Sequence, residues 1–434
     1  MTEVQDHQKP VALQAAVYAV AFFTGSPFIM LSVIMPLWAL ELGSSPFIIG
    51  LIISSRQILV ITMAVHSGAL LDRFGPRTMI IFMGCISAST MALFPFFPFL
   101  TIIIVLQMIS GFAEATIWIG AQTLVGRLLG GRPIYAGRMT ASARVGCVIG
   151  PWVVGLTWQF LGADIAFWFM AGWIAMGGVV ALMLPKSEIV VATSSPAATT
   201  IKTAATTAAN VPTPKDLSAR YSAPKIRRSI LPRFSDYGTT FQLLLLPAVA
   251  LVIAVTFMRQ TGSGIQSSFY GVWLKQIGFE AGAIGLLLGI SNAASAVMAL
   301  TTGALTQRFS EHQLLIGATM LSIAAIAVTP LLSGFALLAV AISLRGVGQG
   351  LNFPLMLAIA SRAVGQHLQG RVVALRITFN RLGGAIVPLA MGVLVEFVGL
   401  EYSFYIVGIA GLFLLGSLSV WTARSPDFDS GPSR

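Results

Sequence analysis

Long apolar runs separated by short polar breaks recur along the whole chain. Each run has about 20 residues or more, enough for an α-helix to cross a hydrocarbon layer of about 30 Å. The pattern predicts twelve spans, at about 12–40, 46–71, 78–97, 100–125, 135–160, 164–185, 240–273, 281–306, 312–332, 335–360, 371–397 and 401–422. The expected fold class is therefore an all-α membrane protein.

Composition and charge agree with a membrane protein. Of 434 residues, 56% are hydrophobic and only 9% are charged, too few to cover a soluble core of this size. The net charge is +11, yet eight of the 26 Lys and Arg residues lie in one linker and no basic face with interleaved aromatic residues appears, so nucleic acid is not an expected partner.

The distribution of charge over the short connections predicts the orientation in the membrane. Basic residues gather in the connections that follow spans 2, 4, 8 and 10, namely Arg73, Arg77, Arg127, Arg132, Arg308 and Arg362. Acidic residues dominate the opposite connections, which carry Glu41, Asp164, Lys275, Glu280 and Glu401. The positive-inside rule then places both termini in the cytoplasm. The expected location is the cell's inner (plasma) membrane, in contact with its lipid.

The chain divides into two halves joined by a polar segment. We predict a cytoplasmic tail over 1–11, a six-helix bundle over 12–185, a flexible basic cytoplasmic linker over 186–236, a second bundle over 237–423 and a tail over 424–434. The linker is rich in Ala, Thr, Ser and Pro, so it buries too little apolar surface to fold alone. Its basic end could also be attracted to anionic lipid.

The two halves repeat each other. A shift of 235 residues aligns Trp38 with Trp273 and Arg73-Phe74 with Arg308-Phe309, and a shift of 237 aligns Arg144 with Arg381. Parallel repeats of this kind are typical of transporters whose halves move about a site between them. The repeat therefore predicts two pseudo-symmetric bundles with a substrate site at their interface.

Three local motifs carry a resemblance to a known family. Gly68-Ala-Leu-Leu-Asp72-Arg73-Phe-Gly75-Pro-Arg77 follows span 2, Gly137-x8-Gly146-x3-Gly150-Pro151-x3-Gly155 lies on span 5, and Arg345-Gly-Val-Gly-Gln349-Gly350 lies on span 10. Together they resemble the major facilitator superfamily, and most of all its branch of proton-coupled exporters of drugs and metabolites. The resemblance implies the twelve-helix major facilitator fold, a small-molecule substrate, a monomer and no cofactor or metal.

The loop after span 2 is the expected gate. A carboxylate at Asp72 can meet the positive N-terminal end of a neighbouring helix, and in the family helix 11 begins nearby. We expect Gly68, Asp72, Arg73, Gly75 and Arg77 to hold the cytoplasmic side closed in one state and release it in the other. The alternative is a hydrated turn that merely ends a helix.

Span 5 has a face without side chains. Gly137, Gly146, Gly150 and Gly155 are spaced to let another helix approach closely, and Pro151 bends the helix. The resemblance associates this pattern with export. The alternative is tight packing that has no bearing on direction.

Charged residues at membrane depth are expected to be functional, because each costs about 2.5 to 3.5 kcal/mol to insert. At 1.5 Å per residue, the middle third of the membrane holds Arg56, Glu114, Arg144, Arg259, Arg345 and Arg381. This excess of cations favours an anionic substrate, which a guanidinium can bind through two parallel hydrogen bonds. The candidate substrate-binding residues are Arg259, Gln260, Gln266, Arg56, Arg345, Arg381, Trp118, Asn292 and Asn352.

Two of these assignments leave alternatives. Arg259 is the strongest candidate, but it could instead pair with another helix or reach outward to the membrane surface. Trp118 stands four residues after Glu114 on the same helical face, where it could stack on a substrate ring or simply pack.

Glu114 is the only acid deep in the membrane, so it is the expected proton carrier. Burial would disfavour its charged form and a nearby Arg144 would favour it, so the pair could release a proton as the cavity opens. A permanent structural pair between Glu114 and Arg144 is equally consistent with the spacing.

These features predict a transporter driven by an ion gradient. The sequence contains no nucleotide-binding loop, no metal-ligand cluster and no catalytic set of Ser, His and Asp, so an enzyme is not expected. The preferred hypothesis is alternating-access, proton-coupled export of an amphipathic organic compound with an anionic group. The alternatives are proton-coupled uptake or exchange of a small organic anion, such as a carboxylate, phosphate ester or siderophore, and a non-transporting assembly or sensor protein.

Overall fold

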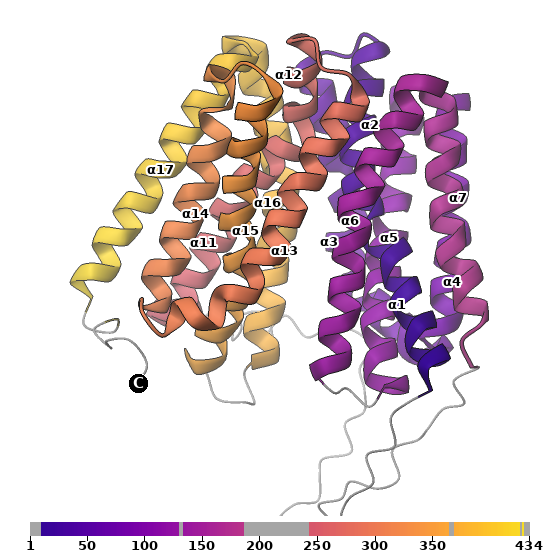
Figure 1. Ribbon diagram of the computed structural model, residues 1–434, viewed down its shortest axis with the longest axis horizontal. Helices are drawn as coiled ribbons and strands as arrows, with labels where there is room; N and C mark the ends of the chain where they lie inside the picture. The colour runs from indigo at the N-terminus through magenta and orange to yellow at the C-terminus, as the bar shows by residue number, and fades with distance from the viewer. Residues whose placement is uncertain (1–9, 130–132, 186–242, 364–368, 426–427, 429–434) are drawn as a thin grey trace, which may run out of the picture.

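A computed structural model describes residues 10–129, 133–185, 243–363, 369–425 and 428 (Figure 1). Within these residues every regular element is helical. Eleven helical segments are long and apolar enough to cross a membrane, and Glu311–Ala327 is a shorter apolar helix. The predicted all-α, multi-pass fold is confirmed. The predicted linker, 186–236, lies outside the described residues, as does most of each predicted tail.

Among its described residues, the first half contains seven α-helices that form six spans. They are α1 (Val11–Gly25), α2 (Pro27–Glu41), α3 (Pro46–Phe74), α4 (Pro76–Leu93), α5 (Leu100–Leu128), α6 (Pro133–Leu161) and α7 (Ala163–Leu182). Proline begins several of them, because its fixed φ suits the first helical turn and its missing N–H is not needed there. The first span is broken at Ser26, directly before the proline that begins α2.

The second half repeats this arrangement. Its helices are α11 (Pro247–Ile265), α12 (Gly271–Gln276), α13 (Ala281–Thr306), α14 (Glu311–Ala327), α15 (Phe335–Ala363), α16 (Gln369–Val398) and α17 (Leu400–Arg424). A π-helical turn over Gln266–Tyr270 joins α11 to α12. Such turns are frequent at functional sites.

Matching turns support the internal repeat. Gly43 follows α2 with a φ of 69°, and its aligned partner Gly278 follows α12 with a φ of 94°. Gly162 and Gly399 precede the last helix of each half with φ values of 88° and 82°. A positive φ suits glycine because it has no Cβ, so these four positions fix the same chain reversals in both halves.

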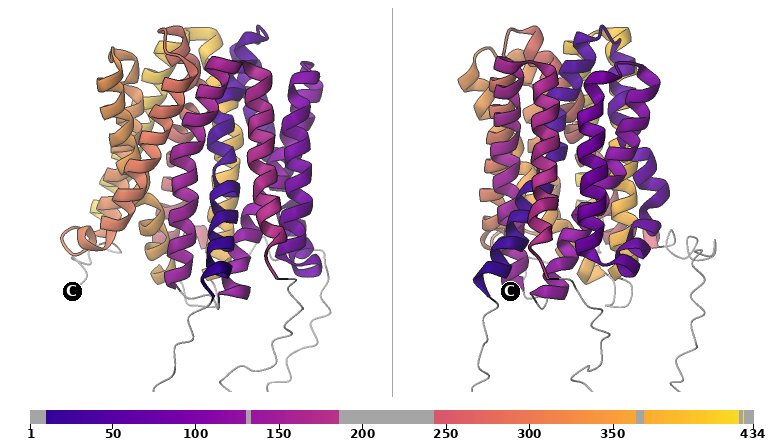
Figure 2. Two further views of the ribbon diagram at one scale, coloured as in Figure 1. Left: turned by 45° about the vertical axis from the view of Figure 1, so that its right-hand side comes forward. Right: turned by 90° about the vertical axis from the view of Figure 1, so that its right-hand side faces the viewer.

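The first and the last described helix of each half have their outer ends at the same end of the bundle. Figures 1 and 2 show α1 beginning, α7 ending, α11 beginning and α17 ending at the lower end in all three views. We call this end the linker side and the opposite end the far side. The turn at Gly75, between α3 and α4, is on the linker side, and the turns at Gly43 and Gly278 are on the far side.

The two halves pack together at the far side and separate toward the linker side (Figure 1). Within the described residues, buried apolar side chains form three clusters. The far-end cluster joins both halves and includes Trp38, Val154, Trp273, Leu288 and Met391. The N-half cluster and the C-half cluster each contain residues of one half only.

Glycines allow the two halves to touch backbone to backbone at the far side. A Cβ on Gly285 of α13 would collide with the carbonyl oxygen of Pro151 in α6, and a Cβ on Gly50 of α3 would collide with that of Pro388 in α16. These contacts close the far side, so the space between the halves faces the linker side.

Candidate functional site

The main cavity, of about 320 Å³, lies between the halves at mid-depth. Four arginines line it, Arg144 from the first half and Arg259, Arg345 and Arg381 from the second. Among the described residues, no Asp or Glu lines it. Its other polar lining residues are Ser32, Gln57, Gln260, Ser263, Gln266, Ser267, Ser291, Asn292, Ser295, Gln349 and Asn380. The cavity is therefore strongly positive and rich in neutral hydrogen-bonding groups.

Arg259 is held at the cavity by side-chain amides. Its Nη1 donates to Gln349 Oε1 at 3.0 Å, and its Nη2 donates to Gln260 Oε1 at 2.9 Å and to Asn380 Oδ1. Its buried Nε has no hydrogen-bond partner. The guanidinium is thus oriented by neutral acceptors, which do not compensate its charge, and its Nε–H is left without a partner.

Arg345 of α15 is only 4% exposed, at the wall shared with α13. Gly346 and Gly350 let the two helices approach closely, because a Cβ on either would meet a backbone oxygen of α13. This approach brings Arg345 Nη1 to Ser291 Oγ at 3.3 Å, and Nη2 lies 3.5 Å from the carbonyl of Gly262. Its Nε, like that of Arg259, has no partner.

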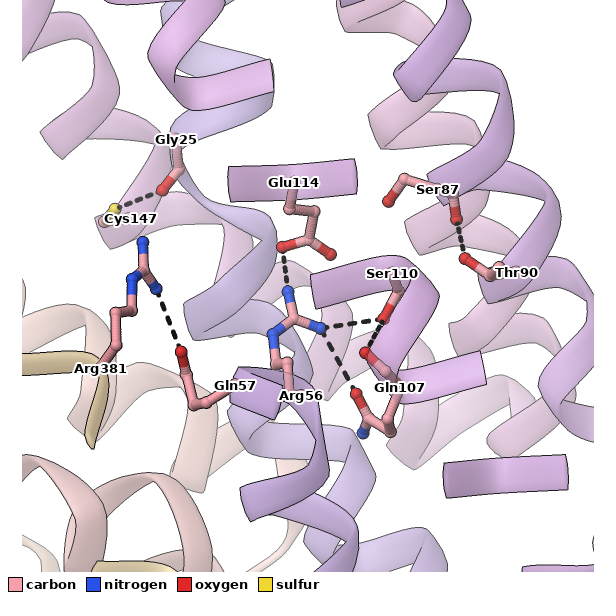
Figure 3. A network of polar contacts seen from close by, with 10 residues as sticks. All are labelled: Gly25, Arg56, Gln57, Ser87, Thr90, Gln107, Ser110, Glu114, Cys147 and Arg381. Atoms are coloured by element: carbon pink, nitrogen blue, oxygen red, sulfur yellow. Dashed lines mark hydrogen bonds and ion pairs between the residues drawn. The ribbon is translucent and has the colours of Figure 1, made fainter. Parts of the chain in front are cut away.

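A second cavity, of about 200 Å³, adjoins the first half's α3 and α5. Arg56 donates there from Nη2 to Glu114 Oε2, and both residues are buried (Figure 3). Arg56 Nη1 also lies 3.4 Å from Gln107 Oε1 and 3.2 Å from Ser110 Oγ. The prediction that Glu114 pairs with Arg144 is wrong, because Glu114 pairs with Arg56 and Arg144 lines the main cavity from α6.

Gly111 is what brings the pair together. A Cβ at this position would collide with the backbone oxygen of Arg56, so only glycine lets α5 approach α3 this closely. Glu114 follows less than one turn later on the same helix. One oxygen of its carboxylate, Oε1, is buried without a hydrogen-bond partner.

Gln57 and Arg381 connect the two cavities. Arg381 Nη1 of α16 donates to Gln57 Oε1 of α3 at 3.3 Å, across the boundary between the halves (Figure 3). Both residues line the main cavity and the second cavity. One hydrogen bond between the halves thus joins Arg381 to Gln57, the residue next to Arg56 in α3.

The family can be identified from a comparison with known proteins. The model of the Major Facilitator Superfamily matches residues 17–258 and 252–434. The chain belongs to this superfamily. Among the curated proteins, none matches the sequence.

Solved structures of other facilitators share the fold. Nucleoside transporter NupG superposes with a TM-score of 0.73 at 14% identity, over 95% of this chain and 100% of its own. A POT family transporter in complex with a thioalcohol-conjugated peptide gives 0.70 at 13% identity, over 96% of each chain. At such identities the likeness concerns the fold alone.

Most of the substrate-binding residues predicted for this facilitator gather at the two cavities. Gln260, Gln266 and Asn292 line the main cavity, and Trp118 lines the second cavity beside Glu114. Asn352 does not join them. It is fully buried, accepts a hydrogen bond at 3.0 Å from Thr319 of α14, and lines neither cavity.

The predicted gating residues of the facilitator loop occupy the end of α3 and the start of α4. Gly75 ends α3 with a φ of 79°, and Arg73 is exposed with its guanidinium 5.2 Å from the Phe74 ring. Arg77 donates to the carbonyls of Ala181 and Leu182, at 3.2 and 2.8 Å, and so caps α7 of its own half. The side chains of Gly68 and Asp72 lie outside the described part of the structure.

The glycines of the facilitator's fifth span contact two different partners. Gly146 and Gly150 pack against the first span, where a Cβ would meet Phe22 and Met30 respectively. Gly155 packs against Ala281 of α13 in the other half. Gly137 has nothing within 4 Å, so it takes no part in this packing.

The sequence reasoning missed several uncharged polar residues at the site. Side chains that hydrogen-bond the buried arginines, but that the sequence did not predict to bind substrate, are Gln57, Gln107, Ser110 and Asn380. Gln349 also binds Arg259, and the sequence pointed to it only as part of the span 10 motif. Gln57 and Asn380 directly adjoin Arg56 and Arg381 in the chain, and this adjacency is the signal that could have identified them.

Proposed function

We propose that the protein is a proton-coupled secondary transporter that carries an organic anion by alternating access. The observation that carries this proposal is the main cavity, where four arginines face a common space and the described hydrogen bonds of three of them go to neutral acceptors. In a poorly hydrated site an uncompensated cation is costly, so an anion is the ligand that such a cavity favours. The free Nε groups of Arg259 and Arg345 supply donors for a carboxylate or phosphate.

The second cavity suits an apolar or aromatic portion of the substrate. Phe28, Val60 and Trp118 line it, next to Arg381, which is shared with the main cavity. A ligand whose anionic group lies among the arginines could extend its ring toward Trp118. This supports an amphipathic anion as the substrate class.

Glu114 is the proposed site of proton coupling. It is 8% exposed, it faces the second cavity, and its Oε1 is without a hydrogen-bond partner. Its ion-pair partner is Arg56 rather than Arg144. A proton on Glu114 would release Arg56, which changes the charge of the site during the cycle.

Two directions of transport are supported by different observations. The span 5 glycine pattern favours export in exchange for protons, by resemblance to the family's antiporters. The positive cavity beside a separate carboxylate favours uptake of the anion together with protons. In either case we propose that the linker side faces the cytoplasm, since Arg73, Arg77, Arg127 and Arg308 belong to linker-side helix ends and turns.

The proposal can be tested in two steps. A thermal-shift screen of the purified protein against organic anions, uncharged analogues and organic cations should identify anions as stabilising ligands, because a ligand that binds only the folded state raises its melting temperature. A stabilising anion should then be driven uphill by a pH gradient in vesicles of known protein orientation, and the sign of the gradient gives the direction. Stabilisation by cations alone, or flux that ignores the gradient, would contradict the proposal.

A further inference from the structure

The proton site and the anion site share three lining residues, Phe28, Gln57 and Arg381. Glu114 and Arg56 belong to the first half, and Gln57 follows Arg56 on α3. Gln57 accepts a hydrogen bond from Arg381, which is one of the four arginines of the main cavity. Charge placed in the main cavity therefore acts on Glu114 across a wall that both cavities share.

Among the described residues, the charged groups that line the cavities next to Glu114 are all positive. The helices packed against α5 are α1, α3, α4 and α6. From α3, Arg56 contacts Glu114 directly, and from α16, Arg381 lines the same cavity. Arg144 of α6 lines the main cavity, whereas the other described titratable groups on these helices, Tyr18, His66, Arg73, Arg77, Cys85, Tyr135, Arg138 and Cys147, line neither cavity.

We propose that anion binding in the main cavity and protonation of Glu114 are positively linked, so that each favours the other, with Arg381 shared between the two sites. This inference rests on the proposed function and adds the sign of its coupling. An anion that pairs with Arg381 offsets the positive charge that Arg381 presents to the Glu114 carboxylate, and it places a negative charge near that carboxylate. Both changes make the ionised form of Glu114 less favourable and its protonated form more favourable.

The reverse effect follows by thermodynamic reciprocity. When Glu114 takes up a proton, Arg56 loses its counter-charge and the site gains one net positive charge, which attracts the anion. A carrier in which anion and proton bind together is a symporter. Exchange of the anion for protons would need the opposite linkage, in which protonation expels the substrate.

The test uses the full-length protein in detergent and a probe that stays ionised at every pH used, 1,3-benzenedisulfonate. Its affinity is measured by calorimetry between pH 5.5 and 8.5. We expect affinity to fall as the pH rises, by up to about tenfold per pH unit where one proton is linked. Binding at constant pH should also take up protons from a weakly buffered solution, which a pH-sensitive dye reports on the wild type without any substitution.

Three variants separate linkage from anion binding. Glu114→Gln should bind the probe with little dependence on pH, whereas Glu401→Gln, an exposed acid on α17, should keep the wild-type dependence. Arg381→Gln should weaken binding and reduce the slope with pH. Arg144→Gln is the matched control because Arg144 lines only the main cavity, so it should weaken binding and leave the slope unchanged.

Each outcome decides one question. An affinity that rises with pH, no dependence on pH, or release of protons on binding would overturn the positive linkage while leaving the anion site intact. A wild-type slope in Arg381→Gln would overturn the shared role of Arg381. Absence of binding of 1,3-benzenedisulfonate, benzenesulfonate and sulfate alike would contradict the proposed function itself.

Discussion

Removing the two members of the buried Arg56–Glu114 pair one at a time should destabilise the protein unequally. Glu114→Gln leaves a guanidinium that is 5% exposed and cannot give up its proton. Breaking a buried pair costs about 3 to 5 kcal/mol. Gln107 and Ser110 still accept hydrogen bonds from Arg56. We therefore expect Glu114→Gln to lower the free energy of unfolding by about 3 kcal/mol, the low end of this range.

Arg56→Gln should cost less, because the carboxylate left behind can neutralise itself by binding a proton. The remaining cost is that of an imperfectly paired polar group, about 1 to 3 kcal/mol, and it should shrink as the pH is lowered. The double variant Arg56→Gln/Glu114→Gln replaces two charges with two amides, so it should be more stable than Glu114→Gln alone. The expected order of stability at pH 7 is the double variant, then Arg56→Gln, then Glu114→Gln.

Thermal unfolding of the four proteins, followed by circular dichroism, measures this order. If the first half unfolds as one unit, 3 kcal/mol corresponds to a drop in melting temperature of about 6 to 12 °C for Glu114→Gln. Glu280→Gln, which removes an exposed partner of Lys275, is the control and should change little. Equal losses in the two single variants, or a double variant less stable than either, would refute the view that the pair compensates two buried charges.

Substitutions at four further positions test the gate, the anion site and the closed far side. Asp72→Asn should slow transport sharply with little change in melting temperature, and a normal transport rate would remove its gating role. Arg259→Lys should weaken anion binding measured by calorimetry and Arg259→Ala should weaken it further, because the ammonium keeps the charge but loses the paired donors; wild-type affinity in both would place the anion elsewhere. Gly285→Ala should destabilise the far-side contact with Pro151 by about 1 to 3 kcal/mol. A cysteine introduced into the cavity should then react faster with a reagent added from the far side. The control Gly172→Ala, with open space around it, should leave the labelling rate at the wild-type value. Glu396→Gln should act in the same direction, since Glu396 Oε2 accepts a hydrogen bond at 3.2 Å from Phe47 N at the start of α3 in the other half; unchanged labelling would show that this bond does not hold the far side.

The fold could be predicted from the sequence because its main determinants are local. Apolar runs of membrane length give the spans, and glycines with positive φ, such as Gly43 and Gly278, mark the repeated turns. The arginines that line the cavity could be identified from their depth in the membrane, because a charge inserted there is costly and is therefore expected to have a function.

Helix neighbours could not be predicted in the same way. The expected pairing of Glu114 with Arg144 assumed that spans 4 and 5, consecutive in sequence, lie side by side. In the structure α5 packs mainly on α3 and α4, and α6 packs on α1, α2 and α13. Packing partners depend on matching surfaces such as Gly111 against Arg56, and these are visible only once the helices are assembled.

The direction in which a side chain points was also hidden. Asn352 lies at the depth of the cavity residues, but it faces Thr319 inside the second half. Arg345, Gln349 and Asn352 follow one another in α15 at intervals of four and three residues, so helical periodicity places them on one side of the helix. Of the three, only Arg345 and Gln349 line the main cavity. Depth along a helix and the side on which a polar residue lies can be counted from the sequence, whereas which residue of that side reaches the cavity and which meets a neighbouring helix cannot.

The far-end cluster should make the rate and the equilibrium of far-side opening depend on temperature. Opening the far side would part side chains such as Trp38, Trp273 and Met391, whereas the N-half and C-half clusters would stay intact. Exposing apolar surface to water raises the heat capacity, so the rate of this step should give a curved Eyring plot. Because hydrophobic contacts weaken on cooling, low temperature should shift the resting population toward the far-open state even without a ligand.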